Sequence, residues 1–261
     1  MSTMIDSRAA VSPKAQLGEN VSVGPFAVIE DDVVIGSGTT IASHALIANG
    51  ARIGKECRIH HGAVLASNPQ DLKFHGEIST LEVGDHTTVR EYATLNRGTH
   101  VRGKTTVGNH CFIMAYAHVA HDCSVGNHVI LANAVNMAGH VVIEDYVVIG
   151  GIVAIHQFTH IGRHAMIGGG FRATKDVPPY ILAGQEPLAF TGLNIVGMKR
   201  RNFPQQTIEV LDRAYQYLYG SNLNVTQALE RIKAELPLLD EVRSMIEFIE
   251  KSKRGIIWKR R

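Results

Sequence analysis

The hydrophobic positions of this chain repeat every six residues over most of its length. Counting in sixes from Val11, each slot is aliphatic as far as Leu65, and the same phase holds from Val83 to Ile167. An α-helix repeats every 3.6 residues and a β-strand every two, so neither alone produces this period. The slot four residues further on holds mainly Ala, Val, Thr or Cys. One large and one small inward side chain per six residues predict a narrow parallel β-helix with short flat faces.

Three hexads make one triangular coil, so residues 18 apart in the sequence should stack about 4.8 Å apart. Two segments are expected to leave the coil as loops. In 66–82, Asp71 and Glu77 occupy the aliphatic phase, and a smaller excursion is expected around 97–104, although Val101 keeps the phase. Loops on a rigid scaffold commonly carry function, so both segments are candidates for a site.

The repeat should end in 176–180, because Pro178 and Pro179 prevent further strand pairing. An extended linker is expected from there to about residue 197. Three helices are then expected, in 207–220, 227–236 and 237–255. The predicted domains are therefore an all-β β-helix domain, 1–191, and a C-terminal α-helical domain, 192–261.

Composition narrows the class of protein. The 261 residues are 45% hydrophobic and carry a formal net charge of +2, which excludes a globally basic nucleic-acid binder. No apolar run is long enough to span a membrane, and the segment from Met1 to Pro13 lacks the apolar core of a secretory signal. We therefore expect a soluble cytoplasmic protein. From residue 192 onward 13 basic residues face 8 acidic ones, which fits either an acidic partner or a solvated helix surface.

The three cysteines carry no separate chemistry. Cys57, Cys111 and Cys123 all occupy the small inward slot of the repeat and form no CxxC motif. They are predicted to be buried thiols, and neither a disulfide framework nor a structural zinc site is expected.

Fourteen histidines are present, many of them between residues 100 and 164. Stacking of one coil on the next places Gly139 on His121, and His140 on Asp122. The same arithmetic pairs His100 with His118, and His110 with His128. One edge of the prism is therefore predicted to carry His118, His121, Asp122, His140, His156 and Gln157.

Three interpretations of this cluster remain open at this point. In the first, His121 is a general base, since a histidine with its ordinary pKa near 6.5 can take a proton from a sugar hydroxyl. Asp122 would orient the ring, which requires a corner because neighbours on a flat strand point apart, and the Gly139 N–H would donate to an oxyanion. In the second, His118, His121 and His140 hold zinc, as three histidines do at the subunit interfaces of γ-class carbonic anhydrases. In the third, these are solvated turn residues of a purely structural solenoid.

Several strings of the sequence resemble one enzyme family closely. They are NPQDLKFHGE at 68–77, AHVAHDCSVGN at 117–127, GHV at 139–141, AIHQF at 154–158, DVPPY at 176–180 and GLNIVGMKRRNF at 192–203. They are similar to the acyl-carrier-protein-dependent UDP-N-acetylglucosamine O-acyltransferases of lipid A biosynthesis, and the resemblance runs essentially from end to end. It implies a left-handed coil for the β-helix. The related glucosamine N-acyltransferases have an extra N-terminal domain, which is not expected here because the repeat starts by residue 11.

The resemblance implies a role for each matching residue. His121 would deprotonate the glucosamine 3-hydroxyl, whose oxygen would attack the thioester of a 3-hydroxyacyl chain on acyl carrier protein. Asp122 would support His121, and the Gly139 N–H would stabilise the oxyanion. Substrate contacts would come from Asp71, Lys73, His118, His140, His156, Gln157, Asn194, Arg200 and Arg201, the last three at the nucleotide. No metal and no cofactor are implied beyond the phosphopantetheine arm of the carrier protein.

The resemblance also implies an assembly and a chain-length determinant. Family members of this kind are homotrimers with clefts between neighbouring prisms, and acyl carrier protein is acidic, which would suit the basic C-terminal region. Gly169 matches the position whose size limits acyl-chain length, and a glycine there implies a long chain. The sequence departs from the family at Val196, where an acidic residue is usual, and at Pro187, where histidine is usual. The choice between a 3-hydroxyl and a 3-amino sugar acceptor stays open.

Overall fold

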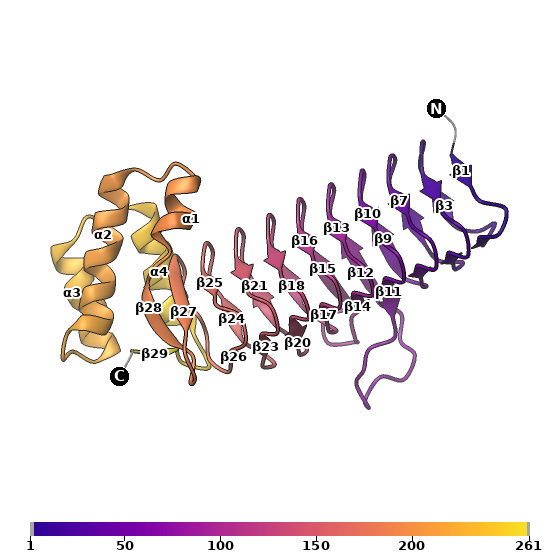
Figure 1. The fold of residues 1–261 in the computed structure, drawn as a ribbon. Coiled ribbons are helices and arrows are strands. Elements are labelled where there is room, and N and C mark those ends of the chain that lie inside the picture. The colour runs from indigo at the N-terminus through magenta and orange to yellow at the C-terminus, as the bar shows by residue number, and fades with distance from the viewer. Residues whose placement is uncertain (1–2, 260–261) are drawn as a thin grey trace.

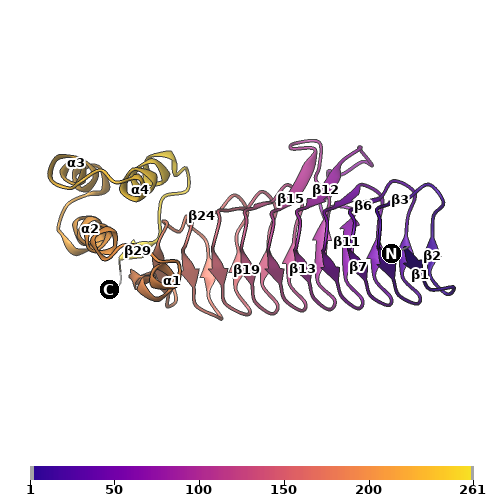
Figure 2. The same ribbon diagram turned by 90° about the horizontal axis from the view of Figure 1, so that it is seen from above.

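The structure is a computed structural model that describes residues 3–259. It shows a long triangular β-helix with a group of helices at its C-terminal end (Figure 1). The strands are two to five residues long and lie in three sheets, seen from above in Figure 2. Each coil contributes one strand to each sheet, so the sheets form the three faces of a prism.

Sheet A contains β1 (Met4–Ile5), β4 (Ser22–Val23), β7 (Thr40–Ile41), β10 (Arg58–Ile59), β13 (Thr88–Val89), β16 (Phe112–Ile113), β19 (Ile130–Leu131), β22 (Val148–Ile149), β25 (Met166–Ile167), β27 (Ile181–Gly184), β28 (Ala189–Leu193) and β29 (Trp258–Lys259). Sheet B contains β2 (Ala10–Val11), β5 (Val28–Ile29), β8 (Leu46–Ile47), β11 (Val64–Ser67), β14 (Thr94–Asn96), β17 (His118–Val119), β20 (Asn136–Met137), β23 (Ala154–Ile155) and β26 (Arg172–Ala173). Sheet C contains β3 (Gln16–Leu17), β6 (Val34–Ile35), β9 (Ala51–Ile53), β12 (Thr80–Val83), β15 (Lys104–Val107), β18 (Ser124–Val125), β21 (Val142–Ile143) and β24 (His160–Ile161).

The six-residue repeat forms the core of the prism, as predicted. The aliphatic residue of each hexad ends its short strand and points inward, and Ile113 and Leu131 are fully buried. Successive coils pair in parallel with the predicted offset of three hexads, for example Ile130 with Val148. The small slot is buried too, and the Cys123 thiol in it has its pKa raised to about 12 by burial. The predicted parallel β-helix and its buried free cysteines are confirmed.

The coil turns between sheets at three corners, which we name A–B, B–C and C–A after the sheets they join. The second residue of a corner turn has a φ near +60°, as at Asp122 (59°), His128 (55°) and His140 (62°). Asp, Asn and His adopt this left-handed conformation more readily than most residues. Turns repeat from coil to coil, so corner side chains form columns along the prism.

Both predicted loops leave the prism at the B–C corner. The first lies between β11 and β12 and projects from the prism in Figure 1, and the second lies between β14 and β15. Val101 in the second loop is 61% exposed, so its agreement with the hexad phase is a coincidence. This loop adds one hexad's length to the coil, and His118 therefore pairs with Thr94 on the strand before the loop. The predicted stacking of His100 on His118 is wrong, and His100 lies beside Glu77 instead.

The segment expected to be an extended linker is a β-hairpin. Strand β27 continues sheet A in parallel with β25, and β28 returns antiparallel to it. The residues after Pro179 therefore extend sheet A instead of forming a linker, because strand pairing resumes directly after the two prolines.

Within residues 3–259, four α-helices follow the hairpin. They are α1 (Ile195–Arg200), α2 (Gln205–Tyr215), α3 (Val225–Glu235) and α4 (Asp240–Lys251), with a π-helical turn, η1 (Gln216–Gly220), after α2. The three predicted helices correspond to α2 with η1, α3 and α4, whereas α1 was not predicted. Asn224 caps α3 with a capping box. Tyr215 is buried and donates to the carbonyl of Pro179 at 2.7 Å, which ties α2 to the end of the prism. No helix within residues 3–259 has the length and apolarity to cross a membrane.

Candidate active site

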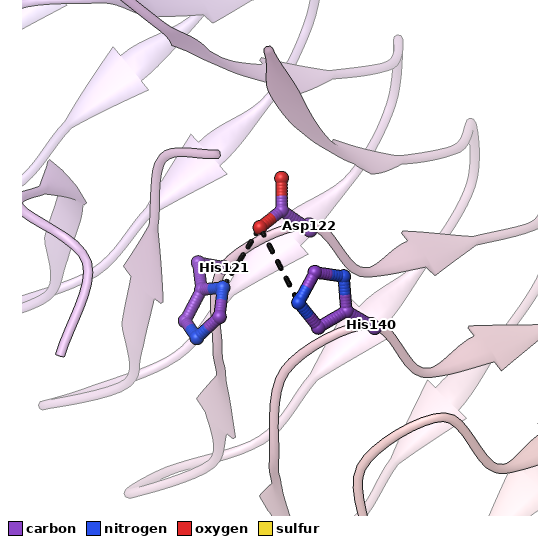
Figure 3. Close-up of side chains that lie close together, drawn as sticks. All are labelled: His121, Asp122 and His140. Carbon is purple, nitrogen blue, oxygen red and sulfur yellow. Dashed lines mark hydrogen bonds and ion pairs between the residues drawn. The ribbon is translucent and has the colours of Figure 1, made fainter. Parts of the chain in front are cut away.

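Two consecutive residues at one B–C corner form the centre of the site. His121 and Asp122 lie in the turn between β17 and β18, where the positive φ of Asp122 lets the neighbouring side chains meet. His121 Nδ1 lies 2.8 Å from Asp122 Oδ2 (Figure 3). The corner geometry that a histidine–aspartate pair requires is therefore present.

The Asp122 carboxylate is fully buried and has four hydrogen-bond donors. Its Oδ2 accepts from His121 and from the Thr99 hydroxyl, and its Oδ1 accepts from the backbone N–H groups of Thr99 and Arg102. Burial alone would raise the pKa of the Asp122 carboxyl. The hydrogen bonds from His121 and Thr99 outweigh that effect, so the pKa of this carboxyl lies below its ordinary value. The carboxylate is therefore ionised at neutral pH.

The ionised partner fixes the proton position on His121. A carboxylate only accepts hydrogen bonds, so Nδ1 of the neutral ring carries the proton and Nε2 keeps a free lone pair. The side chain is 12% exposed, which leaves its edge open to a substrate. This tautomer is the one that a general base needs.

Gly139 lies against the His121 ring, as the stacking arithmetic predicts. A Cβ at position 139 would lie 2.6 Å from His121 Cε1 and 2.7 Å from Nε2, closer than atoms can pack. Only glycine leaves room for the imidazole in this position. Within residues 3–259 no hydrogen bond uses the Gly139 N–H, so this donor is available beside the histidine.

His140 approaches the same carboxylate oxygen from the next coil. Its Nε2 lies 3.8 Å from Asp122 Oδ2, and its ring stands at 90° to that of His121 (Figure 3). Phe158 covers the other face of the ring at a centroid distance of 4.7 Å. Burial, with a contribution from His121, lowers the pKa of His140, while Asp122 and Asp71 oppose this shift. His140 is therefore neutral at pH 7.

His118 lies at the start of β17, one short strand before His121. Its Nδ1 is 2.7 Å from the Thr94 hydroxyl. Burial first and the neighbouring His121 second lower its pKa, so His118 is also neutral at pH 7. The structure thus brings His118, His121, Asp122, Gly139 and His140 together.

Four other predicted residues lie at the margin of this corner. His156 and Gln157 are exposed one coil beyond Gly139, and His156 Nδ1 lies 3.0 Å from the Gln157 carbonyl oxygen. Asp71 and Lys73 lie on the first loop, where the Lys73 N–H donates to the Asp71 carboxylate. Leu72 between them is completely exposed. All four residues belong to the B–C corner or to the loop that leaves it, and none of them bonds to the histidine cluster among the described residues.

The predicted nucleotide residues lie at a different corner. The Asn194 side chain accepts from Gly197 N–H at the start of α1 and donates to the His164 carbonyl, so it is buried in the fold. The Arg201 guanidinium lies 4.1 Å from the ring centroid of Tyr146 on the C–A corner, and Arg200 ends α1 nearby. Within one chain, these residues and His121 therefore lie at different corners of the prism.

Gly169 lies on the third corner, A–B. A Cβ there would lie 3.1 Å from the Gly151 carbonyl oxygen of the preceding coil, so a larger residue would have to displace its surroundings. Val196 is 62% exposed on α1, and Pro187 lies in the turn of the β27–β28 hairpin. The predicted substrate residues are thus spread over all three corners of the prism.

Two residues of the second loop, and one residue of the strand β15 that follows it, belong to the site and were missed from the sequence. Thr99 holds the Asp122 carboxylate, the Thr105 hydroxyl accepts from Asp122 N–H at 2.8 Å, and Arg102 donates to the Asp122 carbonyl at 3.0 Å. The sequence indicated only a loop around 97–104 and did not show that this loop contacts Asp122. Their importance follows from where the loop folds back.

A metal ion is the other chemistry that this geometry allows. The ligand atoms of His121, Asp122 and His140 lie within 4.8 Å of one another. His118, the third histidine of the zinc interpretation, does not join that group among the described residues. His121 Nδ1 is also already engaged with the carboxylate, whereas a catalytic zinc site usually gathers three ligands around an open position.

The fold and site define the chain as a hexapeptide-repeat prism with a histidine–aspartate pair at one corner. Comparison with known proteins agrees: the family described as bacterial transferase hexapeptide (six repeats) matches residues 14–49, 32–67 and 104–139. The family described as UDP N-acetylglucosamine O-acyltransferase, domain 2, matches residues 176–257.

Individual relatives identify the family. The acyl-[acyl-carrier-protein]–UDP-N-acetylglucosamine O-acyltransferases of Aquifex aeolicus and Xanthomonas oryzae are 46% and 44% identical, over 74% and 75% of this chain and 75% of each relative. The crystal structure of the UDP-N-acetylglucosamine acyltransferase of Bacteroides fragilis has a TM-score of 0.96 at 45% identity, covering 97% of this chain and all of that one. The chain belongs to the UDP-N-acetylglucosamine O-acyltransferase family and is an acyltransferase with a left-handed β-helix. The carbonic anhydrase alternative is not supported.

Proposed function

We propose that this enzyme transfers a 3-hydroxyacyl chain from acyl carrier protein to the glucosamine 3-hydroxyl of UDP-N-acetylglucosamine, the first step of lipid A biosynthesis, in the cytoplasm. The observation that carries the proposal is the buried His121–Asp122 pair with Gly139 against its ring. The names of the relatives supply the donor and the acceptor.

The geometry supports a general-base mechanism. His121 Nε2 takes the proton of the sugar hydroxyl while its oxygen attacks the thioester carbonyl carbon. The negative charge that develops on the carbonyl oxygen is stabilised by the free Gly139 N–H. The tetrahedral intermediate then collapses, the carbon–sulfur bond breaks, and the proton on His121 passes to the departing phosphopantetheine thiolate. Asp122 stays ionised and stabilises the imidazolium between the two transfers.

The neighbouring residues would bind the substrates. His118, His140, His156 and Gln157 lie along the same corner as His121, and the neutral imidazoles of His118 and His140 can donate to or accept from sugar hydroxyls without repelling a protonated His121. Asp71 and Lys73 would reach the substrate from the first loop. No metal and no cofactor other than the carrier's own arm are required by this mechanism, which stays a prediction.

A homotrimer would complete the site. Asn194, Arg200 and Arg201 lie near the C–A corner, while His121 lies at the B–C corner, so one nucleotide sugar cannot contact both sets in one chain. A neighbouring copy that packs its C–A corner against this B–C corner would supply the arginines. Arginine forms forked, charge-assisted hydrogen bonds that suit a diphosphate.

The remaining assignments concern the acyl chain and its carrier. Gly169 would bound the acyl groove, with Pro187 and Val196 as departures whose effect on substrate contacts is open. The surplus of basic residues after position 192 would receive the acidic carrier protein. The division into domains 1–191 and 192–261 stays a prediction.

The test is a direct turnover assay. Purified protein is incubated with UDP-N-acetylglucosamine and a panel of 3-hydroxyacyl carrier proteins, and products are read by mass spectrometry. The reverse reaction is run in parallel, because an oxygen ester formed from a thioester need not accumulate on this sugar. An acylated sugar nucleotide supports the proposal and gives the chain length. No product in either direction from folded protein would reject this acceptor, and a 3-amino sugar nucleotide would be tried next.

A further inference from the structure

The second loop, residues 97–103, folds back onto the catalytic corner of the same chain. Its strongest contact is made by Thr99, which is 2% exposed and bonds to Asp122, itself fully buried. We propose that Thr99 is a positioning residue: it orients the Asp122 carboxylate so that this carboxylate pairs with His121 and not with His140.

The argument starts from the two carboxylate oxygens. Oδ1 is held by the backbone, with the N–H groups of Thr99 at 3.0 Å and Arg102 at 3.3 Å. Oδ2 accepts from the Thr99 hydroxyl at 2.7 Å and from His121 Nδ1 at 2.8 Å. Two backbone donors on one oxygen locate the group but leave it free to pivot about that oxygen. The hydroxyl bond fixes the position of the second oxygen, which is the one that meets His121.

The hydroxyl of Thr99 is itself oriented. The Val101 N–H donates to Thr99 Oγ1 at 3.2 Å, which occupies a lone pair of that oxygen. Its O–H therefore points to Asp122, in a charge-assisted hydrogen bond. The direction of this bond is set within the loop and does not depend on the substrate.

A competing partner makes this orientation matter. His140 Nε2 lies 3.8 Å from the same Oδ2, so a modest pivot of the carboxylate would exchange one histidine for the other. His121 would then lose the acceptor that keeps its proton on Nδ1 and its lone pair on Nε2. Arg102 adds a positive group on the same side, with its guanidinium on the Asp122 carbonyl. The loop therefore selects which imidazole becomes the base.

The backbone shows that the loop and the corner are joined as a unit. The Asp122 N–H donates to Thr105 Oγ1 at 2.8 Å, so the loop and the strand β15 that follows it bond to the same aspartate. The extra residues interrupt the coil that precedes the one holding His121 and Asp122, between β14 and β15. A loop of this size disturbs the regular stacking of the coils, and its contacts with Asp122 hold the carboxylate of the site in place.

The inference rests on the proposed function and is tested with Thr99→Val, which keeps the shape of the side chain and removes the hydroxyl. We expect kcat to fall about 10-fold to 100-fold with KM changed by less than about twofold, because hydrogen bonds to charged groups have effects of this size. Thr99→Ser should restore kcat to within about threefold. Thr159→Val is the matched control, since Thr159 is fully buried and its hydroxyl has no partner among the described residues.

A double-mutant cycle separates positioning from a structural role. If Thr99 acts through the carboxylate, Thr99→Val should change kcat by less than about twofold once Asp122→Ala has removed it. A wild-type kcat in Thr99→Val, or the full loss repeated on the Asp122→Ala background, would overturn the proposal.

A spectroscopic measurement keeps the inference testable apart from turnover. In protein with ¹⁵N-labelled histidine, the Nδ1–H proton bonded to Asp122 should resonate far downfield and should move upfield in Thr99→Val but not in Thr159→Val. An unchanged resonance would contradict the proposal. Absence of turnover by the unmodified protein would count against the proposed function, while this comparison of resonances would still decide the role of Thr99.

Discussion

The B–C and C–A corners of the prism both carry histidines, but their rings are arranged differently at the two corners. At the C–A corner, aromatic rings stack face to face along the prism with centroid distances of 4.7 to 5.5 Å and angles of 13° or less. This histidine ladder consists of His86, His110, His128, Tyr146, His164 and Tyr180. At the B–C corner, the His121 and His140 rings are perpendicular and both approach a buried carboxylate.

The difference lies in what interrupts the coil. The ladder runs through regular turns, so its rings stack on the rings above and below, and Arg201 and Phe203 pack against it from outside the ladder. At the B–C corner two loops leave the prism, and the second returns to bury Asp122 and satisfy it with hydrogen bonds. At this corner an ionised carboxylate fixes the tautomer of His121, and that carboxylate stays ionised because a loop supplies its hydrogen-bond donors. Residue type and periodicity alone do not distinguish the two corners.

The largest expected effect tests this distinction directly. His121→Ala should lower kcat about 10²-fold to 10⁴-fold, the usual contribution of a general base, with the melting temperature nearly unchanged because the Asp122 carboxylate keeps its hydrogen bonds from Thr99 and Arg102. The ladder supplies the control: His86→Ala should retain kcat within about twofold. Rates are measured with saturating donor and acceptor. Equal losses in the two variants would show that the corners do not differ in the way the structure indicates.

Gly139→Ala should have the next largest effect. The added Cβ would lie 2.6 Å from His121 Cε1, so the imidazole must move away from its place against Asp122. A displacement of this kind in a catalytic group costs about 10² in rate. We would measure kcat and the melting temperature. The melting temperature should change little because Gly139 lies in a turn. Normal turnover would mean that the ring tolerates displacement, and the close packing of Gly139 would then have no catalytic meaning.

The β-helix and the contacts among His121, Asp122, Gly139 and His140 could be predicted from the sequence, and the physical reason is the same for the fold and for the site. A repeating coil converts sequence spacing into spatial neighbours, so the contacts of His121 with Gly139 and of Asp122 with His140 follow from counting in eighteens. The counting fails wherever residues are inserted. His118 stacks on Thr94 and not on His100, because the second loop lengthens the coil between Thr94 and His118.

The part that the sequence did not reveal depends on where a loop goes after it leaves the coil. Thr99 and Arg102 have no periodic position, and nothing in their spacing shows that they return to Asp122. The hairpin of β27 and β28 was hidden for a related reason: Pro178 and Pro179 end the regular coil, yet strand pairing with sheet A resumes at once. The six-residue period predicts the regular coil, whereas the path of a loop or hairpin that departs from the coil can be found only from the three-dimensional structure.

The A–B corner sharpens the comparison with a smaller effect. Gly169→Met would add a side chain at a position where even its Cβ would lie 3.1 Å from the Gly151 carbonyl oxygen. If this corner bounds the acyl groove, turnover of the longest accepted 3-hydroxyacyl donor should fall about tenfold relative to a shorter donor, since a few methylene groups change discrimination by this factor. Competition between donors of different length, read by mass spectrometry, gives the ratio. An unchanged length profile would place the chain-length determinant elsewhere.

The smallest expected effect concerns stability at the ladder. Burial, followed by Arg201 and Arg163, lowers the pKa of His164 from its ordinary 6.5 to about 4. The unfolded chain therefore binds a proton first as the pH falls, so stability is lost between about pH 6.5 and 4, by about 1 kcal/mol at pH 5.5. His164→Phe keeps the stacking on Tyr146 and Tyr180 and removes the titration. The difference between the free energies of unfolding at pH 7.5 and 5.5, measured in urea at one protein concentration, should shrink by about 1 kcal/mol, and an unchanged difference would show that His164 is not held neutral.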